Sequence, residues 1–275
     1  MSQIKVACVQ MRSGTDVAAN IADASALIHQ AAGQGAELVA TPEMTTLLDR
    51  KPGAVWDKST TEDADPGLKA FTVLAKDLKI TLLIGSLAVR AQGNKCANRS
   101  FLIGPDGQVV ARYDKIHMFD VQLNAGNVYR ESDSFAAGSE AVIANLPAGP
   151  LGMTVCYDVR FPDLYRQLAV GGAKIIAVPA AFTRITGEAH WHILLRSRAI
   201  ETGCYIIAPA QGGKHQDGRE TYGHSLIIDP WGEVLAEAGI EPGVITATLD
   251  LAKVDDVRGK IPSLKHIRDF HPRKS

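Results

Sequence analysis

Short apolar runs alternate with longer segments of helical periodicity along most of the chain. The runs Ile4–Met11 and Glu37–Thr41 are rich in β-branched and apolar residues, which predicts two buried strands. Between them, apolar residues recur at helical spacing over Val17–Ala32, behind a capping residue at Thr15 or Asp16. This β-α-β order predicts parallel strands in a layered α/β fold.

The same two patterns continue to the end of the chain. Further helices are predicted at Gly67–Leu78, Pro162–Val170 and Glu188–Thr202. Further strands are predicted at Ile80–Ala88, Asn98–Ile103, Gln108–Tyr113, Ala141–Leu146, Met153–Val155, Lys174–Pro179, Cys204–Ala210, Tyr222–Asp229, Glu233–Glu237 and Val244–Leu249. Hairpin turns at Gly104–Gly107 and Pro230–Gly232 interrupt the βα alternation, so we expect mixed sheets. The β-α-β then β-β order occurs once in each half, which indicates two related layers.

We find no linker or change of composition and predict one domain over residues 1–275. The polar segment Leu123–Gly138 reads as an irregular loop, and a loop of that length is usually functional. The basic tail at about 258–275 is too polar for a core and is predicted to be a frayed end or an arm across a partner subunit.

Composition narrows the possible classes. The 275 residues are 46% hydrophobic and 21% charged, as in ordinary globular proteins, and the net charge of -1 offers no basic excess for nucleic acid or an anionic membrane. No apolar run is long enough to span a membrane, and no secretory leader pattern precedes the first strand. Cys8, Cys96, Cys156 and Cys204 lie far apart, which argues against a zinc finger or a disulfide framework. Reduced thiols predict a cytoplasmic protein.

The stretch Leu151–Pro162 carries the first sign of chemistry. Its apolar run leads directly into Cys156, and a polar cluster and a helix start follow. This order places a thiol at the carboxyl end of a strand, where open α/β sheets form their sites, and close to a helix N-terminus that would favour the thiolate. A buried core cysteine is the alternative for any lone thiol.

Two further residues lie just past predicted strand ends, Glu43 and Lys115. Each alone could be a solvated surface charge. Together with Cys156 they supply what amide or nitrile cleavage needs: a nucleophile, a carboxylate that moves its proton to the leaving nitrogen, and a cation for the developing negative charge. The backbone N–H of Tyr157 is a candidate second donor to that charge.

Three separated motifs resemble the nitrilase superfamily of carbon–nitrogen hydrolases: Ala40–Glu43, Tyr113–His117 and Cys156–Pro162. Similar stretches follow at Pro179–Phe182, His190–Trp191, Arg196–Glu201, Tyr222–Ser225 and Asp229–Gly232. The resemblance implies a four-layer α-β-β-α sandwich of two mixed sheets, with Glu43 as base, Lys115 as oxyanion donor, Cys156 as nucleophile and Glu131 as a second glutamate that orients Lys115. It also implies a homodimer or a higher homo-oligomer, with arms such as Lys260–Arg268 over the partner, and a small amide substrate.

Within the superfamily the chain is most similar to the deaminated glutathione amidase and omega-amidase group. The similarity implies hydrolysis of a terminal carboxamide of a carboxylate-bearing substrate to carboxylate and ammonia, through a cysteine thioester. Arg160 could grip the substrate carboxylate, or it could pair with Asp158 or Asp163 to fix the turn. Phe182 and Thr183 follow a strand end on the same edge and are further candidates for binding substrate. An N-carbamoyl amino acid hydrolase or a nitrilase on the same fold is the alternative, although the arginine pair usual in carbamoylases is reduced here to Arg160.

Three other classes fit the residues less well. A Cys–His thiol hydrolase could use His117, His190 or His224 as its base, but it would leave Glu43 and Lys115 idle. A metal site at His190, His192 and His215 is disfavoured because the first two, being two positions apart, do not share a helix face. A binding protein on the same fold would not require the complete Glu-Lys-Glu-Cys set. We therefore expect an enzyme without metal or cofactor.

Overall fold

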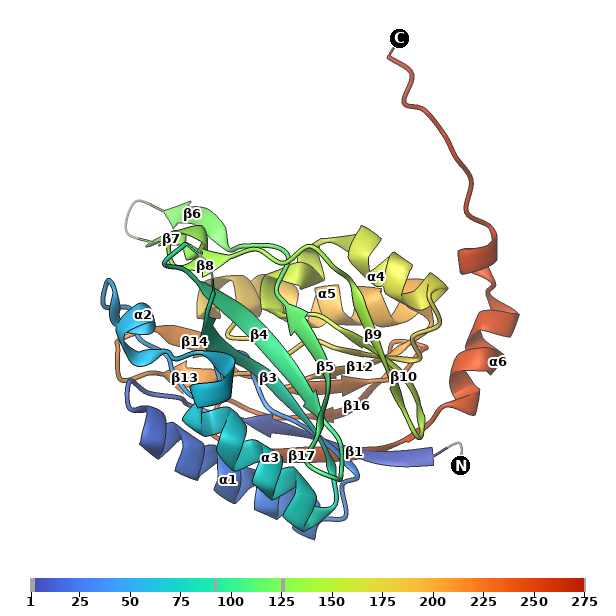
Figure 1. Ribbon diagram of the computed structural model, residues 1–275. Coiled ribbons are helices and arrows are strands. Elements are labelled where there is room, and N and C mark those ends of the chain that lie inside the picture. Colours follow the sequence, from blue (N-terminus) through green and yellow to red (C-terminus); the bar gives the residue numbers. More distant parts are fainter. Residues whose placement is uncertain (1–2, 92, 125–126, 275) are drawn as a thin grey trace.

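The computed structural model describes residues 3–91, 93–124 and 127–274, and it forms four layers (Figure 1). Two mixed sheets pack face to face, and helices cover the outer face of each. This is the α-β-β-α sandwich that the sequence resemblance implies.

The first half of the chain builds one helix layer and most of one sheet. Its elements are β1 (Gln3–Gln10), α1 (Val17–Gly33), β2 (Leu38–Ala40), α2 (Ala54–Lys58), α3 (Pro66–Leu78), β3 (Thr81–Arg90), β4 (Cys96–Ile103) and β5 (Val109–Asp114). Helix α1 begins where its cap predicts, because the side chain of Asp16 accepts a hydrogen bond from the N–H of Ala19.

The second half begins with a small hairpin and then builds the other sheet and its helices. Its elements are β6 (Asp120–Asn124), β7 (Asn127–Arg130), β8 (Phe135–Ala136), β9 (Val142–Leu146), β10 (Gly149–Met153), α4 (Pro162–Val170), β11 (Ile175–Ala177), α5 (Arg184–Thr202), β12 (Tyr205–Ala208), β13 (Gly212–Lys214), β14 (Glu220–Tyr222), β15 (Leu226–Ile228), β16 (Val234–Glu237), β17 (Gly243–Asp250) and α6 (Ala252–Lys260). Short 3-10 turns lie at Glu62–Ala64, Glu131–Asp133, Cys156–Arg160 and Ser263–Lys265.

The two sheets repeat one strand plan. The first has the order β17-β1-β2-β3-β4-β5, with β8 beside β4, and the second has the order β9-β10-β11-β12-β15-β16. Within each order the pairings run antiparallel, parallel, parallel, antiparallel, antiparallel. The expected mixed sheets and the expected repetition between halves are both confirmed.

Strand β1 shows why the apolar runs are continuous rather than alternating. Val6 and Cys8 point into the core between the sheets, whereas Ala7 and Val9 point into the core beneath α1 and α3. A strand buried on both faces has no polar side, so it reads as an unbroken hydrophobic run.

The structure corrects four predicted boundaries. The supposed irregular loop over Leu123–Gly138 contributes to the antiparallel β6–β7 hairpin and contains β8. The predicted strand Tyr222–Asp229 is two strands in different sheets, because the backbone turns at Gly223 and His224, both with positive φ. Helix α5 begins at Arg184, where Thr183 caps it, four residues earlier than its apolar spacing indicated. The tail also begins later than predicted, since position 258 is still within α6.

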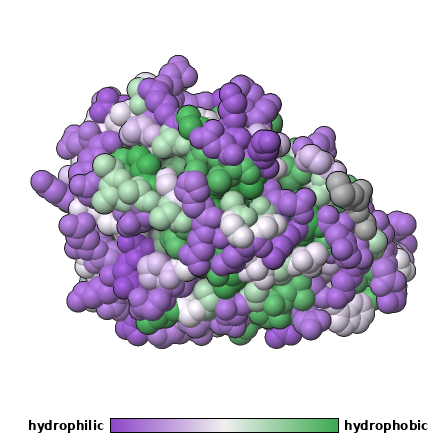
Figure 2. All heavy atoms as spheres, turned by 90° about the horizontal axis from the view of Figure 1, so that it is seen from below, coloured by the Kyte–Doolittle hydropathy of each residue, from purple (hydrophilic) through white to green (hydrophobic). Residues whose placement is uncertain are grey.

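The outer surface carries both kinds of side chain. Seen from below, apolar residues gather in patches among polar ones (Figure 2). Within the described ranges, no helix is long and apolar enough to cross a membrane. After α6 the chain runs away from the body as an extended, exposed segment (Figure 1).

Candidate active site

Glu43 lies where segments of the two sheets are in contact. It follows β2 and is only 5% exposed. Its Oε2 accepts a 2.8 Å hydrogen bond from the N–H of Ala181. Ala181 lies in the segment that connects β11 of the opposite sheet to α5. Gly85 in β3 permits this approach, because a Cβ there would lie 2.1 Å from the Thr41 carbonyl oxygen and 2.5 Å from Pro179 Cβ. A side chain at this position would push the sheets apart at the site.

Lys115 follows β5 and lies between two carboxylates. Its Nζ is 2.8 Å from Glu43 Oε1 and 2.8 Å from Glu131 Oε2, and its side chain is 2% exposed. Asn98 on β4 reinforces the arrangement, since its Nδ2 donates to Glu43 Oε1 at 2.9 Å and to Glu131 Oε1 at 3.0 Å. The N–H of Phe119 also donates to Glu131 Oε2, at 2.7 Å. Both carboxylates are therefore held by several donors.

Cys156 opens the 3-10 turn after β10 with a φ of 49°, a left-handed conformation that is unusual for a residue other than glycine. Its N–H donates to the Pro179 carbonyl oxygen at 2.9 Å. The first hydrogen bond within the turn runs from the N–H of Asp158 to the carbonyl oxygen of Val155. The N–H of Tyr157 precedes that donor, so the geometry of the turn leaves it without an acceptor inside the turn. The turn, rather than α4, immediately follows the thiol.

Asp158 fixes this turn from behind. It is fully buried, and its Oδ2 accepts hydrogen bonds from the Tyr113 hydroxyl at 2.6 Å and the Val155 N–H at 2.8 Å. Its Oδ1 accepts from the N–H of His117 at 3.1 Å and lies 2.7 Å from the His117 Nδ1. These contacts connect the nucleophile turn to the end of β5, from which Lys115 projects.

The charges of the site depend on one another. Burial alone would raise the pKa of Glu43, but Lys115 outweighs it and holds that pKa below its usual range. Burial would likewise lower the pKa of Lys115, whereas Glu131 and Glu43 raise it well above its usual range. Burial and the nearby Glu43 carboxylate raise the pKa of the Cys156 thiol well above its usual range. At neutral pH Glu43 is therefore ionised, Lys115 is an ammonium and the Cys156 thiol is neutral.

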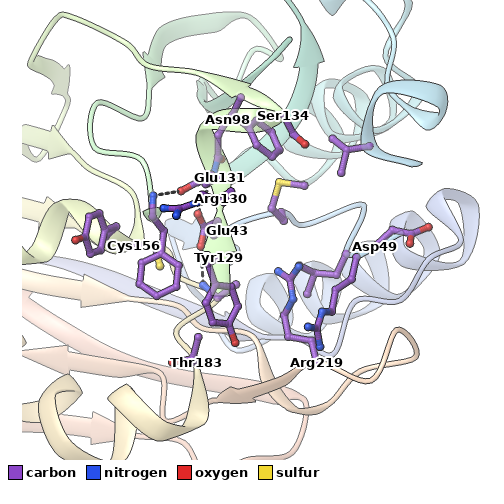
Figure 3. Close-up of a pocket in the computed structure, with 18 of the residues that line it drawn as sticks. Glu43, Asp49, Asn98, Tyr129, Arg130, Glu131, Ser134, Cys156, Thr183 and Arg219 are labelled. Atoms are coloured by element: carbon purple, nitrogen blue, oxygen red, sulfur yellow. Dashed lines mark hydrogen bonds between the residues drawn. The ribbon is translucent and has the colours of Figure 1, made fainter. Parts of the chain in front are cut away.

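These groups open into a cavity of about 320 Å³ (Figure 3). That volume is typical of sites for small molecules. Seven of the eight residues predicted for the site line it: Glu43, Lys115, Glu131, Cys156, Tyr157, Phe182 and Thr183.

Arg160 is the exception. It is absent from the described cavity lining, and its guanidinium lies over the Phe182 ring, with Cζ 5.1 Å from the centroid. Both terminal nitrogens lie 3.3 Å from His190 Nδ1. The predicted pairing with Asp158 or Asp163 is also absent from the described contacts, because Asp158 binds the groups named above and Asp163 pairs with Arg166.

The histidines lie outside the cavity lining that the structure describes. The alternative of a Cys–His pair therefore has no base beside Cys156. The structure also separates the histidines proposed for the metal alternative. His192 Nε2 lies 2.9 Å from Glu237 Oε1, which His224 Nδ1 approaches to 2.8 Å, whereas His190 contacts Arg160. His215 is buried elsewhere, against the Ser13 carbonyl oxygen and the Thr221 hydroxyl.

The sequence analysis missed residues that act through position rather than reactivity. Asn98 and Asp158 belong to this group, and so does Arg219 at the far side of the cavity. Asp158 stands two places after the cysteine, so its motif could have drawn attention to it. Nothing in the local pattern marks Asn98 or Arg219, because each reaches the site through tertiary contacts.

Comparison with known proteins agrees with this geometry. Residues 5–259 match the carbon–nitrogen hydrolase family. A deaminated glutathione amidase from Synechocystis sp. is 42% identical over 97% of this chain and 98% of its own. The NitFhit protein of C. elegans superposes with a TM-score of 0.90 at 34% identity, over 97% of this chain, which spans 65% of that longer one. An amidase from Nesterenkonia sp. AN1, with a TM-score of 0.79 and 26% identity over 94% of this chain and 98% of that one, carries in one solved form an acrylamide adduct on its active-site cysteine.

The chain therefore belongs to the carbon–nitrogen hydrolases of the nitrilase superfamily. It is an enzyme, and its full-length similarity to curated amidases makes it an amidase of that superfamily.

Proposed function

We propose that this enzyme hydrolyses a linear amide of a small, carboxylate-bearing substrate through a thioester on Cys156. The observation that carries the proposal is the buried Cys156 thiol beside Glu43, a carboxylate that Lys115 holds at 2.8 Å in the same cavity. A carboxylate that stays ionised beside a thiol that stays protonated is the arrangement that general-base activation of the thiol requires.

Acylation begins when the Cys156 sulfur attacks the amide carbon and its proton passes to Glu43. The oxyanion of the tetrahedral intermediate accepts hydrogen bonds from Lys115 Nζ and from the Tyr157 N–H. Glu43 then gives its proton to the leaving nitrogen, the C–N bond breaks, and a thioester remains on Cys156.

Deacylation repeats these roles with water as the nucleophile. Glu43 takes a proton from the water as it attacks the thioester carbon, and the same two donors hold the second oxyanion. The C–S bond then breaks, the carboxylate product leaves, and Glu43 returns the proton to the sulfur. Glu131 and Asn98 keep Lys115 and Glu43 in position throughout.

The relatives favour deaminated glutathione as the substrate. The omega-amide of a 2-oxo acid, a smaller compound, is the second candidate that the sequence resemblance implies. Glutathione has no primary carboxamide, since both of its amide bonds join two residues. Hydrolysis of its deaminated form therefore releases an amine, and the predicted release of ammonia applies only to the omega-amides.

A panel of five compounds tests the proposal: deaminated glutathione, 2-oxoglutaramate, 2-oxosuccinamate, an N-carbamoyl amino acid and an aliphatic nitrile. We expect turnover of the first three compounds. Mass spectrometry of substrate and products measures this turnover. Turnover of the carbamoyl compound or the nitrile alone would instead assign the alternative function of an N-carbamoyl amino acid hydrolase or a nitrilase. Turnover of none would remove the proposal.

The pH dependence follows from the direction of each pKa shift. The active form carries an ionised Glu43. Because the pKa of Glu43 is lowered, the carboxylate stays charged at pH values below the ordinary glutamate pKa of about 4.3. The raised pKa values of Cys156 and Lys115 preserve the thiol and the ammonium beyond about pH 9. We therefore expect kcat/KM to be constant from about pH 5.5 to about pH 9 and to fall only on more acidic or more basic sides. A limb near pH 6.5 in the measured profile would indicate a catalytic histidine instead.

We also propose a homodimer that uses the outer face of α4 and α5. An apolar groove there is lined by Val170, Ile200, Trp231 and Ile261, each more than half exposed. The extended C-terminal segment leaves the body beside this groove and is positioned to reach a second copy (Figure 1). Sedimentation equilibrium should give twice the monomer mass for the native chain and the monomer mass for Ile200→Glu. An unchanged mass in that variant would contradict this interface.

The single-domain organisation and the cytoplasmic location stay predictions. The four cysteines are free and buried, which agrees with the reduced thiols from which the cytoplasmic location is predicted.

A further inference from the structure

The cavity has two ends with different charge. Cys156 lies at one end with Glu43 and Glu131, and Arg219 lies at the other, with Tyr129 between them (Figure 3). The far end, where Asp49 and Arg219 lie, is cationic, because the lining also includes Arg50 and Lys51, which directly follow Asp49 in the chain; Arg130 lies beside Glu131 instead (Figure 3). Asp49 is itself bound to Lys58 at 2.7 Å.

Most of this positive charge is free to meet a ligand. Among the described residues, Arg50 and Lys51 form no ion pair with a side chain, and both are exposed. Three cations at one end of a small cavity attract anionic substrates and have little effect on neutral ones. The cation at the reacting end, Lys115, is itself held between Glu43 and Glu131, so it is not free to bind a substrate carboxylate.

Arg219 is the member of this group that the fold holds most firmly. It precedes β14 in the β13–β14 hairpin, and its backbone N–H donates to Asp217 Oδ1 at 2.9 Å. The hairpin is bound to the cavity wall, because the N–H of Tyr222 donates to the Phe182 carbonyl oxygen at 2.9 Å. Thr183, at the start of α5, also pairs with this hairpin. The arginine therefore stands on the same frame as Phe182 and Thr183, which line the cavity.

The side chain of Arg219 has hydrogen-bonding capacity left over. Its Nε is buried and lies 3.8 Å from Asp217 Oδ2, too far for a hydrogen bond, and neither atom has another partner among the described residues. The carboxylate behind the guanidinium balances part of its charge and limits its orientation, while the side chain remains 25% exposed at the cavity. A planar guanidinium held in this way presents a fork that matches a carboxylate.

We propose that Arg219, supported by Arg50 and Lys51, binds a carboxylate at the end of the substrate remote from the scissile amide. This inference rests on the proposed function and deepens it. A substrate shaped like deaminated glutathione would place its acyl carbon at Cys156 and the carboxylate of its glycine end at Arg219. The smaller 2-oxoglutaramate forms the same acyl group on Cys156 but has no leaving-group carboxylate to bind there.

Binding measured without turnover tests the subsite directly. In a Cys156→Ala background, calorimetry would compare deaminated glutathione with an analogue whose glycine carboxylate is a carboxamide. We expect the acid to bind about 10- to 100-fold more tightly, the ratio typical of a charge-assisted bidentate contact. Adding Arg219→Gln should bring the two affinities to within about twofold, and adding Arg219→Lys should keep part of the preference because the charge remains.

Lys214→Gln is the matched control, because Lys214 is exposed on the same hairpin but lies outside the described cavity lining. This variant should keep the full preference for the acid. A preference that survives Arg219→Gln, or an equal loss of affinity for both compounds, would overturn the subsite.

Turnover by the unmodified enzyme separates the two proposals. Tight, Arg219-dependent binding without hydrolysis would remove the proposed function and support the subsite. Hydrolysis with no preference for the acid would do the opposite. In the unmodified enzyme, Arg219→Gln should lower kcat/KM for deaminated glutathione about 10- to 100-fold and leave kcat/KM for 2-oxoglutaramate within about twofold.

Discussion

Replacing Cys156 by alanine is expected to abolish amide hydrolysis while the protein remains folded. The thiol is the only group in the proposed mechanism that forms a bond to substrate, and loss of a nucleophile of this kind typically lowers kcat by roughly 10⁴-fold or more. Folding should survive, because the substitution removes only one buried sulfur atom, which carries no charge as a neutral thiol. The test measures turnover with the five-compound panel and thermal unfolding of the same preparation.

Cys96→Ala provides a matched control for that experiment. Cys96 is equally buried, in a small cluster with Met44 and Phe135, but it is absent from the described cavity lining. We expect this variant to keep its activity with a modest loss of stability. Substantial hydrolysis by Cys156→Ala would contradict the thioester mechanism, and inactivity of both variants would assign the loss to structure.

Replacing Lys115 by methionine should remove both activity and stability. Loss of the cation removes one oxyanion donor, which typically costs about 10²- to 10³-fold in kcat. It also leaves Glu43 and Glu131 facing each other in a buried site without their shared counter-charge. Removing one partner of a buried ion pair typically lowers the free energy of unfolding by about 3–5 kcal/mol. Denaturant unfolding and steady-state kinetics would measure the two effects separately.

A double variant separates those two roles of the lysine. Lys115→Met combined with Glu131→Gln removes one positive and one negative charge, so much of the lost stability should return. Activity should not return, because the oxyanion donor is still missing. Recovery of activity together with stability would show that Lys115 only supports the fold. A stability loss below about 1 kcal/mol for the single variant would contradict the buried charge network.

Most of the fold was predictable because its strands are buried on both faces. Segments such as β1 and β3 read as continuous apolar runs, and the helices between them carry clear caps and one-sided apolar stripes. The errors in the predicted elements occur where the tertiary structure differs from what the local sequence pattern indicates. Tyr222 and Leu226 belong to different sheets, although the intervening sequence looks like one strand, because two left-handed residues turn the chain between them. The β6–β7 hairpin is too polar to be recognised by burial.

The sequence by itself determined which groups we propose to be reactive in this protein. Glu43, Lys115 and Cys156 each follow a strand that its apolar residues reveal, and strand ends of a layered α/β fold converge on one edge. Only the tertiary structure decided how they are charged and what surrounds them. Burial and mutual proximity keep the thiol protonated and the carboxylate ionised, and these effects depend on distances that no local pattern contains. For the same reason Asn98 and Arg219 could not be recognised. Asn98 binds Glu43 and Glu131, which are 55 and 33 positions away, and only the fold brings Arg219 to the cavity that holds Cys156.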